Sequence, residues 1–442
     1  MNTYVAVVLV YFVIVVLISF LTKKIASRSS ADFLIAGRNL GLITCAVVVA
    51  SEWLGGMSTI GVSEKAFKTG TLQPILYNLS TATGMIIIGF TVARHYREKG
   101  VHTVSEMIEH LFDKRSRNIS AIAFLIAYIT LAFVQLQTCA GVIAPLFSIP
   151  WWVAVLISAL IITIYTYVGG LHALAITSVV HVIVMFSGIA IATFIGLDKV
   201  GGIGGLQNIL VNLPNNPSPA NLYNPFSAGF MEAFSLLLGG VLGGMAGQAS
   251  IQPIFAARTP KIARQSAVLS AFIIAPFGIM IALLGLMAKT GLFFDISNIE
   301  PKTILTTLLM NSEFIHPILG GLALSGILAA ILSTVGPVNF AVVTIAAKDI
   351  YQGIMKHSAD DKSVLNTAKN LVILVNVITI PLAILLKGTI LDVAYVSYAI
   401  RAIGAIVILL GIYAVWGINK TSVRWAFLGG TTVIFTVSYT HL

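Results

Sequence analysis

The sequence predicts an all-α polytopic membrane protein with about twelve transmembrane helices. Of its 442 residues, 57% are hydrophobic and only 10% are Asp, Glu, Lys or Arg, whereas soluble domains carry about 25% of these charged residues. The mean hydropathy is +0.97, so the chain has more apolar surface than one aqueous core can bury. Apolar runs long enough to cross a bilayer also recur along the whole chain. A soluble globular fold is therefore excluded.

Each predicted span is a run of roughly 20 mainly apolar residues, the length that a helix needs to cross the hydrocarbon core. The first run lacks the positive start of a secretion signal and is followed by Lys23, Lys24 and Arg28, so we interpret it as a retained anchor with an external N-terminus. In order, the twelve predicted spans are 4–22, 41–62, 72–94, 118–147, 150–168, 173–196, 228–255, 266–289, 317–347, 366–386, 389–416 and 424–440.

The distribution of positive charge supports this orientation. With the N-terminus outside, nineteen Lys and Arg residues fall in cytoplasmic loops, six fall in external loops, and Arg401 lies within a span. An excess of basic residues on the cytoplasmic side governs how spans insert. We therefore expect a multi-pass protein of the inner (plasma) membrane. The net charge of +10 is not arranged as a basic stripe interleaved with aromatic residues, so nucleic acid is not an expected partner.

Two spans contain glycine clusters near their centres, at Ser51–Ser58 and at Gly239–Gln248. A helix that breaks inside the bilayer exposes peptide groups at several kcal/mol each, so a break implies a cavity in which protein, ion or ligand satisfies them. The alternative is that both clusters only permit close helix packing. However, these spans are the second and the seventh, the first members of two successive sets of five, as expected for inverted repeats around a midplane site.

This pattern divides the chain into five parts. We expect an N-terminal extra helix and cytoplasmic loop at 1–40, a first five-helix repeat at 41–196, an external loop at 197–226, a second five-helix repeat at 227–416, and an additional C-terminal helix, possibly cut short, at 417–442.

The residues at the two breaks are the candidates for solute binding. Glu52 and Arg401 are charges placed deep in spans, where they are costly unless paired or functional; they form a structural ion pair or address the charged ends of a solute. Glu232 and Asp392 lie near span ends, where interface contacts are expected, and His181 is expected to be a packed core residue. The full candidate set is Glu52, Trp53, Gly55, Gly56, Met57, Ser58, Gly243, Gly244, Met245, Gln248 and Arg401.

Four segments resemble a known family. They are Ala36–Gly41 at the entry to the second span, Trp53–Gly56, the run from Gly247 to Arg264, and Ala329–Thr334. With them the chain resembles the sodium:solute symporter family. This resemblance implies the five-plus-five fold of the bacterial leucine transporter, preceded by one extra helix.

The resemblance also implies a sodium site between the second and ninth spans. The backbone carbonyls of Ser51, Leu54 and Ala330 and the hydroxyls of Ser333 and Thr334 would hold the ion, and five uncharged oxygens suit a monovalent cation. The alternative is that both hydroxyls only bond back to the preceding turn. Many relatives carry Thr-Asp where this chain has Thr177-Ser178, so a carboxylate thought to help sodium leave is missing.

We therefore expect a sodium-coupled symporter that imports a small polar solute by alternating access and functions as a monomer in the lipid bilayer. Arg401 favours a carboxylate-bearing solute, either an amino acid or an organic acid. Sodium is the coupling ion, no other cofactor is expected, and no hydrolase or nucleotide-binding motif indicates an enzyme. Two alternatives stay open, a proton-coupled carrier of the same fold and a transporter-like solute sensor.

Overall fold

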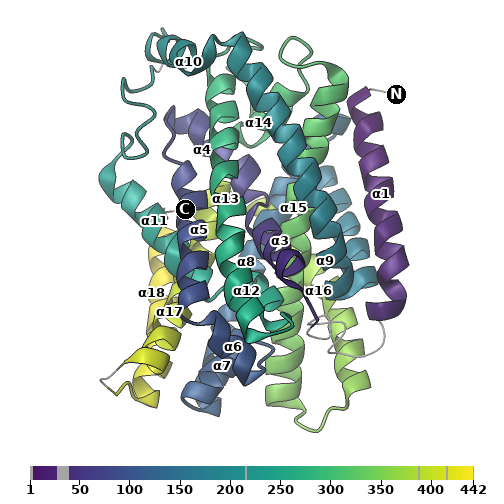
Figure 1. Ribbon diagram of the computed structural model, residues 1–442, viewed down its shortest axis with the longest axis vertical. Helices are drawn as coiled ribbons and strands as arrows, with labels where there is room; N and C mark the ends of the chain where they lie inside the picture. The colour runs from purple at the N-terminus through teal and green to yellow at the C-terminus, as the bar shows by residue number, and fades with distance from the viewer. Residues whose placement is uncertain (1–2, 27–38, 215–216, 387–388, 415–416, 442) are drawn as a thin grey trace.

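The computed structural model describes residues 3–26, 39–214, 217–386, 389–414 and 417–441. Over these ranges the chain is helical, with no strand and a single isolated β-bridge between Leu40 and Ala257. Figure 1 shows the helices running mostly alongside one another in one bundle. The predicted all-α class is confirmed.

The helices of the first half begin with α1 at Thr3–Ala26. Those that follow are α3 (Leu42–Trp53), η2 (Met57–Gly61), α4 (Val62–Thr69), α5 (Ile75–Phe90), α6 (Ala93–Lys99), α7 (Val104–Leu111), α8 (Lys114–Phe147), α9 (Trp151–Lys199) and α10 (Gly202–Val211).

The second half begins with α11 at Phe230–Met245. Those that follow are α12 (Gln248–Phe255), α13 (Pro260–Lys289), η3 (Pro301–Thr303), α14 (Ile304–Leu309), α15 (Pro317–Thr344), η4 (Ile345–Met355), α16 (Asp361–Leu385), α17 (Ile390–Tyr413) and α18 (Lys420–His441).

Within the described ranges, seven helices are long and apolar enough to cross a membrane, and nine if each of two bent helix pairs counts as one span. The count of twelve stays a prediction. One difference is clear in α9, which covers both predicted spans 150–168 and 173–196 as a single helix.

Segments predicted to connect the spans lie at both ends of the bundle. The start of α1 lies at the same end as α10 and α14, whereas α6 and α7 lie at the opposite end (Figure 1). The segments around α6 and α7, assigned to the cytoplasm, thus lie at the opposite end from those around α10 and α14, assigned to the outside; which end faces the cytoplasm stays a prediction.

The helix at the centre of the core is α15, which contacts α9, α1, α8, α3 and α16. Nearly all of its side chains from Gly320 to Thr344 are buried. Its closest neighbour is α9, where Gly188 lies against the α15 backbone: a Cβ there would be 2.7 Å from the Leu322 carbonyl oxygen and 2.9 Å from the Ala323 Cα. A small residue is thus required where these two helices meet.

We expect Gly188→Val to lower the stability of the folded protein by about 1–3 kcal/mol, because the added side chain forces α9 and α15 apart. Thermal unfolding of the purified protein in detergent measures the change. Gly429→Ala on α18 is the matched control, because a Cβ at Gly429 has no atom within 4 Å. Equal melting temperatures for the two variants would contradict this account of the interface.

Candidate functional site

The second predicted span is broken where the sequence predicts. Helix α3 ends at Trp53, residues 54–56 are not helical, and the chain continues as η2 and α4 with a bend of 53°. Only part of the backbone bonding is kept across the break, where the Leu54 amide donates to the Ala50 carbonyl at 3.1 Å and the Thr59 amide donates to the Gly55 carbonyl at 3.1 Å. The peptide groups between these bonds need partners from outside the helix.

A second interruption lies in the seventh predicted span. Helix α11 ends at Met245, and α12 begins at Gln248. Between them Gly247 has an extended ψ of 99°. A Cβ at this glycine would lie 2.5 Å from the Ser250 Oγ and 3.1 Å from the Arg401 Nη1, so the interruption lets the chain approach the arginine closely.

The Ser333 and Thr334 hydroxyls on α15 meet the end of α3. Ser333 Oγ donates to the Ser51 carbonyl at 2.7 Å, and it also lies 2.8 Å from the Ala330 carbonyl. Thr334 Oγ1 donates to the Glu52 carbonyl at 2.6 Å. Four of the five predicted ion ligands are therefore brought together, and all of them are buried.

The fifth predicted ligand, Leu54, is the first residue of the break. The Glu52 carbonyl, which the sequence did not indicate, contacts the Thr334 hydroxyl instead. Gly55 explains why Thr334 can come so close, since a Cβ at this position would lie 1.9 Å from Thr334 Oγ1. Gly56 faces Thr138 on α8 in the same way, since a Cβ added at Gly56 would lie 2.2 Å from Thr138 Oγ1.

Arg401 on α17 is fully buried in an aromatic cage formed by Tyr398, Tyr128 and Trp53. Its guanidinium carbon lies 4.1, 5.4 and 5.9 Å from the respective ring centroids, and Nη1 donates to Tyr128 Oη at 3.2 Å. Aromatic faces stabilise a cation, and the effect grows when water is excluded.

Of the two roles left open for Glu52 and Arg401, the ion pair is not formed among the described residues of this structure. Among the described residues, the Glu52 Oε2 and the Arg401 Nε and Nη2 have no hydrogen-bond partner. The physical reason is the cage, because the ring faces and the Tyr128 hydroxyl stabilise the guanidinium without a carboxylate. A buried carboxylate oxygen and two buried guanidinium nitrogens are thus left available near the breaks.

Three buried residues that the sequence did not indicate, Tyr77, Asn78 and Tyr398, contact the predicted Met57 and Ser58 beside the broken span. Tyr77 Oη and Tyr398 Oη are 2.7 Å apart, and both lie within 3.9 Å of the Met57 sulfur. Ser58 Oγ donates to the Trp53 carbonyl at 2.5 Å and accepts from Asn78 Nδ2 at 3.2 Å. Polar residues inside apolar spans were the only available signal for these positions.

The glycines of the second interruption pack against the aromatic cage. A Cβ at Gly243 would lie 2.7 Å from the Tyr398 Cβ, and one at Gly244 would lie 3.4 Å from the Trp53 ring. Met245 is also buried. Gln248 does not join this cluster: its Oε1 accepts from the Val104 amide at 2.8 Å, and its Nε2 donates to the His102 carbonyl at 2.9 Å.

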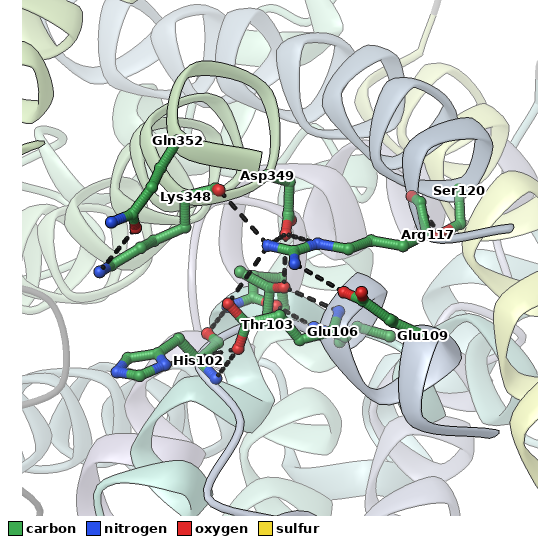
Figure 2. Close-up of polar contacts among 11 residues, drawn as sticks. His102, Thr103, Glu106, Glu109, Arg117, Ser120, Lys348, Asp349 and Gln352 are labelled. Carbon is green, nitrogen blue, oxygen red and sulfur yellow. Dashed lines mark hydrogen bonds and ion pairs between the residues drawn. The ribbon is translucent and has the colours of Figure 1, made fainter. Parts of the chain in front are cut away.

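A cluster of charges joins α7, α8 and η4 at the end of the bundle where α6 and α7 lie (Figure 2). Arg117 is 2.9 Å from the buried Asp349, 2.6 Å from Glu109 and 3.4 Å from Glu106. Thr103 Oγ1 also donates to Asp349 at 3.0 Å. Although burial by itself raises the pKa of Glu106, its hydrogen bonds to His102 and the charge of Arg117 lower that pKa to about 2. This carboxylate therefore stays ionised at physiological pH.

A smaller cluster lies at the opposite end. Lys65 on α4 is 2.7 Å from Glu232 and 3.1 Å from Asp392, so these two acidic residues make the contacts expected near span ends. His181 is buried and lies 2.8 Å from the Tyr11 hydroxyl, as expected for a core residue. Within the described residues, no group of three or more His, Cys, Asp or Glu side chains is placed to hold a metal ion.

Comparison with known proteins gives a consistent result. A sequence model of the sodium:solute symporter family matches residues 33–431. The osmoregulated proline transporter OpuE of Bacillus subtilis is 25% identical over 91% of this chain and 82% of its own length. The human high affinity choline transporter 1 is 25% identical over 77% of this chain and 59% of its own length.

Solved structures agree on the fold. The structure of a Na⁺-coupled sialic acid symporter in a substrate-bound, outward-open state has a TM-score of 0.80. The similarity covers 99% of this chain and 97% of that one, at 16% sequence identity.

We expect Arg117→Gln to destabilise the fold by about 3–5 kcal/mol, because it leaves Asp349 as a buried carboxylate without its cation. The double variant Arg117→Gln/Asp349→Asn should recover most of this loss, since it removes both charges. Thermal unfolding of the purified variants measures the coupling.

Glu106 gives this cluster a pH dependence. Its folded-state pKa of about 2 lies below the ordinary value of 4.5, so its stabilising contribution is complete above pH 4.5 and is lost as the pH falls toward 2.

One outcome would contradict the prediction for Arg117. If the double variant Arg117→Gln/Asp349→Asn is as unstable as Arg117→Gln alone, the cluster does not act through the charge of Asp349.

Proposed function

We propose, from the premise that this chain belongs to the sodium:solute symporter family, that sodium binds between α3 and α15 and drives uptake of a carboxylate-bearing solute beside Arg401. Sodium-coupled solute symport is the general activity of the family, and its members are transporters rather than enzymes. The sodium ligands, the solute and the transport cycle are the parts proposed for this chain.

The observation that carries the proposal is the meeting of two hydroxyls with a broken helix end. Ser333 and Thr334 lie within 2.7 Å of the Ser51 and Glu52 carbonyls respectively. With the Ala330 carbonyl, these atoms form a compact set of uncharged oxygens of the kind that holds a monovalent cation. Leu54 carries the remaining carbonyl. Both hydroxyls also bond back to the Ala330 carbonyl in the preceding turn, Ser333 at 2.8 Å and Thr334 at 3.4 Å, but the contacts with α3 accompany these bonds.

The solute is proposed from the free groups beside this set. Arg401 Nε and Nη2 have no hydrogen-bond partner among the described residues, and a guanidinium binds a carboxylate through two parallel hydrogen bonds. Glu52 Oε2 is an equally buried acceptor that suits an amine. Together they favour an amino acid over a simple organic acid. A cationic amine such as choline is less favoured, because the aromatic cage that would hold it is filled by Arg401.

The proposed cycle is alternating access in a five-plus-five inverted repeat. Charge clusters lie at both ends of the bundle, around Lys65 and around Arg117, and each joins helices that must separate when its side opens. The bend of 53° in the second span gives its two halves separate orientations. Each sodium ion entering the cell gains about 2.3 kcal/mol per 100 mV, enough to concentrate a solute more than tenfold.

A proton-coupled carrier of the same fold is the second candidate, because the buried Glu52 Oε2 has no hydrogen-bond partner and is a possible proton acceptor. His181 does not favour it, since this ring is bonded to Tyr11 away from the breaks.

Ser333→Ala and Thr334→Ala should each raise the sodium concentration for half-maximal uptake at least tenfold, because each removes one of about five ion ligands. The assay is solute uptake into proteoliposomes, with a panel of amino acids and organic acids tested with and without an inward sodium gradient. Ser325→Ala is the control, since this α15 hydroxyl only bonds back to Gly321 at 2.8 Å. Uptake that follows a pH gradient and ignores sodium would favour the proton-coupled carrier.

Arg401→Gln and Arg401→Lys should each weaken binding of a carboxylate solute by about 10- to 100-fold, the loss expected for one or two charged hydrogen bonds. Sodium binding should persist, because Arg401 contacts none of the proposed ligands. Solute binding by calorimetry and sodium-dependent thermal stabilisation separate the two effects. Arg424→Gln is the control for the loss of a cation, because Arg424 forms an ion pair with Asp113 and is not one of the proposed solute-binding residues. Unchanged solute affinity would place the solute elsewhere.

A further inference from the structure

A groove unrelated to the ion and solute site runs along the start of α13. It has a volume of about 500 Å³ and lies between α13, the first residue of α3 and the last residue of α5. Its lining combines two cations with apolar side chains. The lining residues that matter here are Leu42, Phe90, Lys261, Arg264, Val268 and Phe272.

The α13 residues of the groove form one stripe. Lys261, Arg264, Val268 and Phe272 follow one another at intervals of three or four positions, so they share a helix face. The cations come first and the apolar residues follow. From Lys261 to Phe272 the stripe extends about 16 Å at 1.5 Å per residue, close to the thickness of one leaflet of the hydrocarbon core.

The cationic end of the groove has no negative counterpart among the described residues. Neither Lys261 nor Arg264 forms an ion pair with any acidic residue in the described ranges, and both are exposed. The first turn of α13 contains no acidic residue, so the partial positive charge of the helix start adds to theirs. This end of the groove is therefore complementary to a phosphate group.

The apolar end is open to the lipid. Phe90 and Phe272 are 61% and 71% exposed, and Arg264 lies over the Phe90 ring with its guanidinium carbon 4.9 Å from the centroid. The stacking places a cation at the boundary between the charged and apolar parts of the groove. Along the groove, a cationic site that suits a phosphate is followed by apolar contacts. This order matches the headgroup and upper acyl chain of a phospholipid.

We propose that this groove binds an anionic phospholipid of the cytoplasmic leaflet, with its phosphate at Lys261 and Arg264 and an acyl chain along Val268 and Phe272. The leaflet follows from the basic residues that place the α12–α13 connection in the cytoplasm. Leu42 is the first residue of α3, so the bound lipid contacts the inner half of the broken span and holds it against α5 and α13.

Native mass spectrometry of the full-length protein tests this site, with titration of phosphatidylglycerol, phosphatidylethanolamine and phosphatidylcholine of the same acyl chains. Phosphatidylglycerol should bind preferentially, and Lys261→Gln/Arg264→Gln should weaken that binding by roughly tenfold or more, since each cation near an anionic lipid contributes about a factor of five. Phe272→Ser should also weaken it with both cations intact. The control Lys356→Gln/Lys362→Gln removes two exposed cations outside the groove and should change nothing.

Three outcomes would overturn the proposal. They are equal binding of the three lipids, an equal loss in the control variant, and full displacement of phosphatidylglycerol by excess inorganic phosphate, which would make the groove a phosphate site without a role for the acyl chain. A thermal stabilisation by phosphatidylglycerol that is lost in Lys261→Gln/Arg264→Gln and kept in the control would support it independently, and would show that the variant is folded.

Discussion

The structure depends on the need to satisfy peptide groups where α3 stops inside the bundle. A carbonyl without a partner in a water-free interior costs several kcal/mol, and at Ser51 and Glu52 the partners come from Ser333 and Thr334 on α15. This contact requires Gly55, because any side chain there would occupy the position of the Thr334 hydroxyl. It also explains why α15 is buried along nearly its whole length: the helix that completes the break has to lie at the centre.

A second constraint is the charge of Arg401. A guanidinium removed from water needs compensation, and a carboxylate partner is only one way to provide it. Here the faces of Tyr398, Tyr128 and Trp53 surround it. An ion pair with Glu52 would have occupied the same groups that the proposed zwitterionic solute would bind. The cage stabilises the cation while leaving Nε and Nη2 unbonded, so the charge is stabilised and the donors remain available.

The features that could be predicted from the sequence are those that depend on local residue patterns. Apolar runs located the helices, and glycine clusters located both interruptions to within a few residues, because breaking a helix is a local property. The pair Ser333-Thr334 was assigned to the end of α3 through a family resemblance, and the structure brings these residues together. Contacts that depend on which distant side chains meet were missed. Nothing near Arg401 in the chain indicates Tyr128, which lies 273 positions away, and nothing near Gln248 indicates that its amide bonds the backbone at residues 102–104.

The proposed ion site and the broken helix share the same oxygen atoms. In the arrangement described here, the Ser333 and Thr334 hydroxyls donate hydrogen bonds to the Ser51 and Glu52 carbonyls, so the protein alone satisfies these two carbonyls. A sodium ion held by these oxygens would replace hydrogen bonds with coordination, and both arrangements would satisfy the carbonyls. The free energy of sodium binding would then be the difference between two states in which the carbonyls have partners, not the gain from supplying partners to carbonyls that had none. An ion held in the proposed site by such a difference, without a formal negative charge among the five proposed ligands, would be bound weakly enough to be released on the side where its concentration is low.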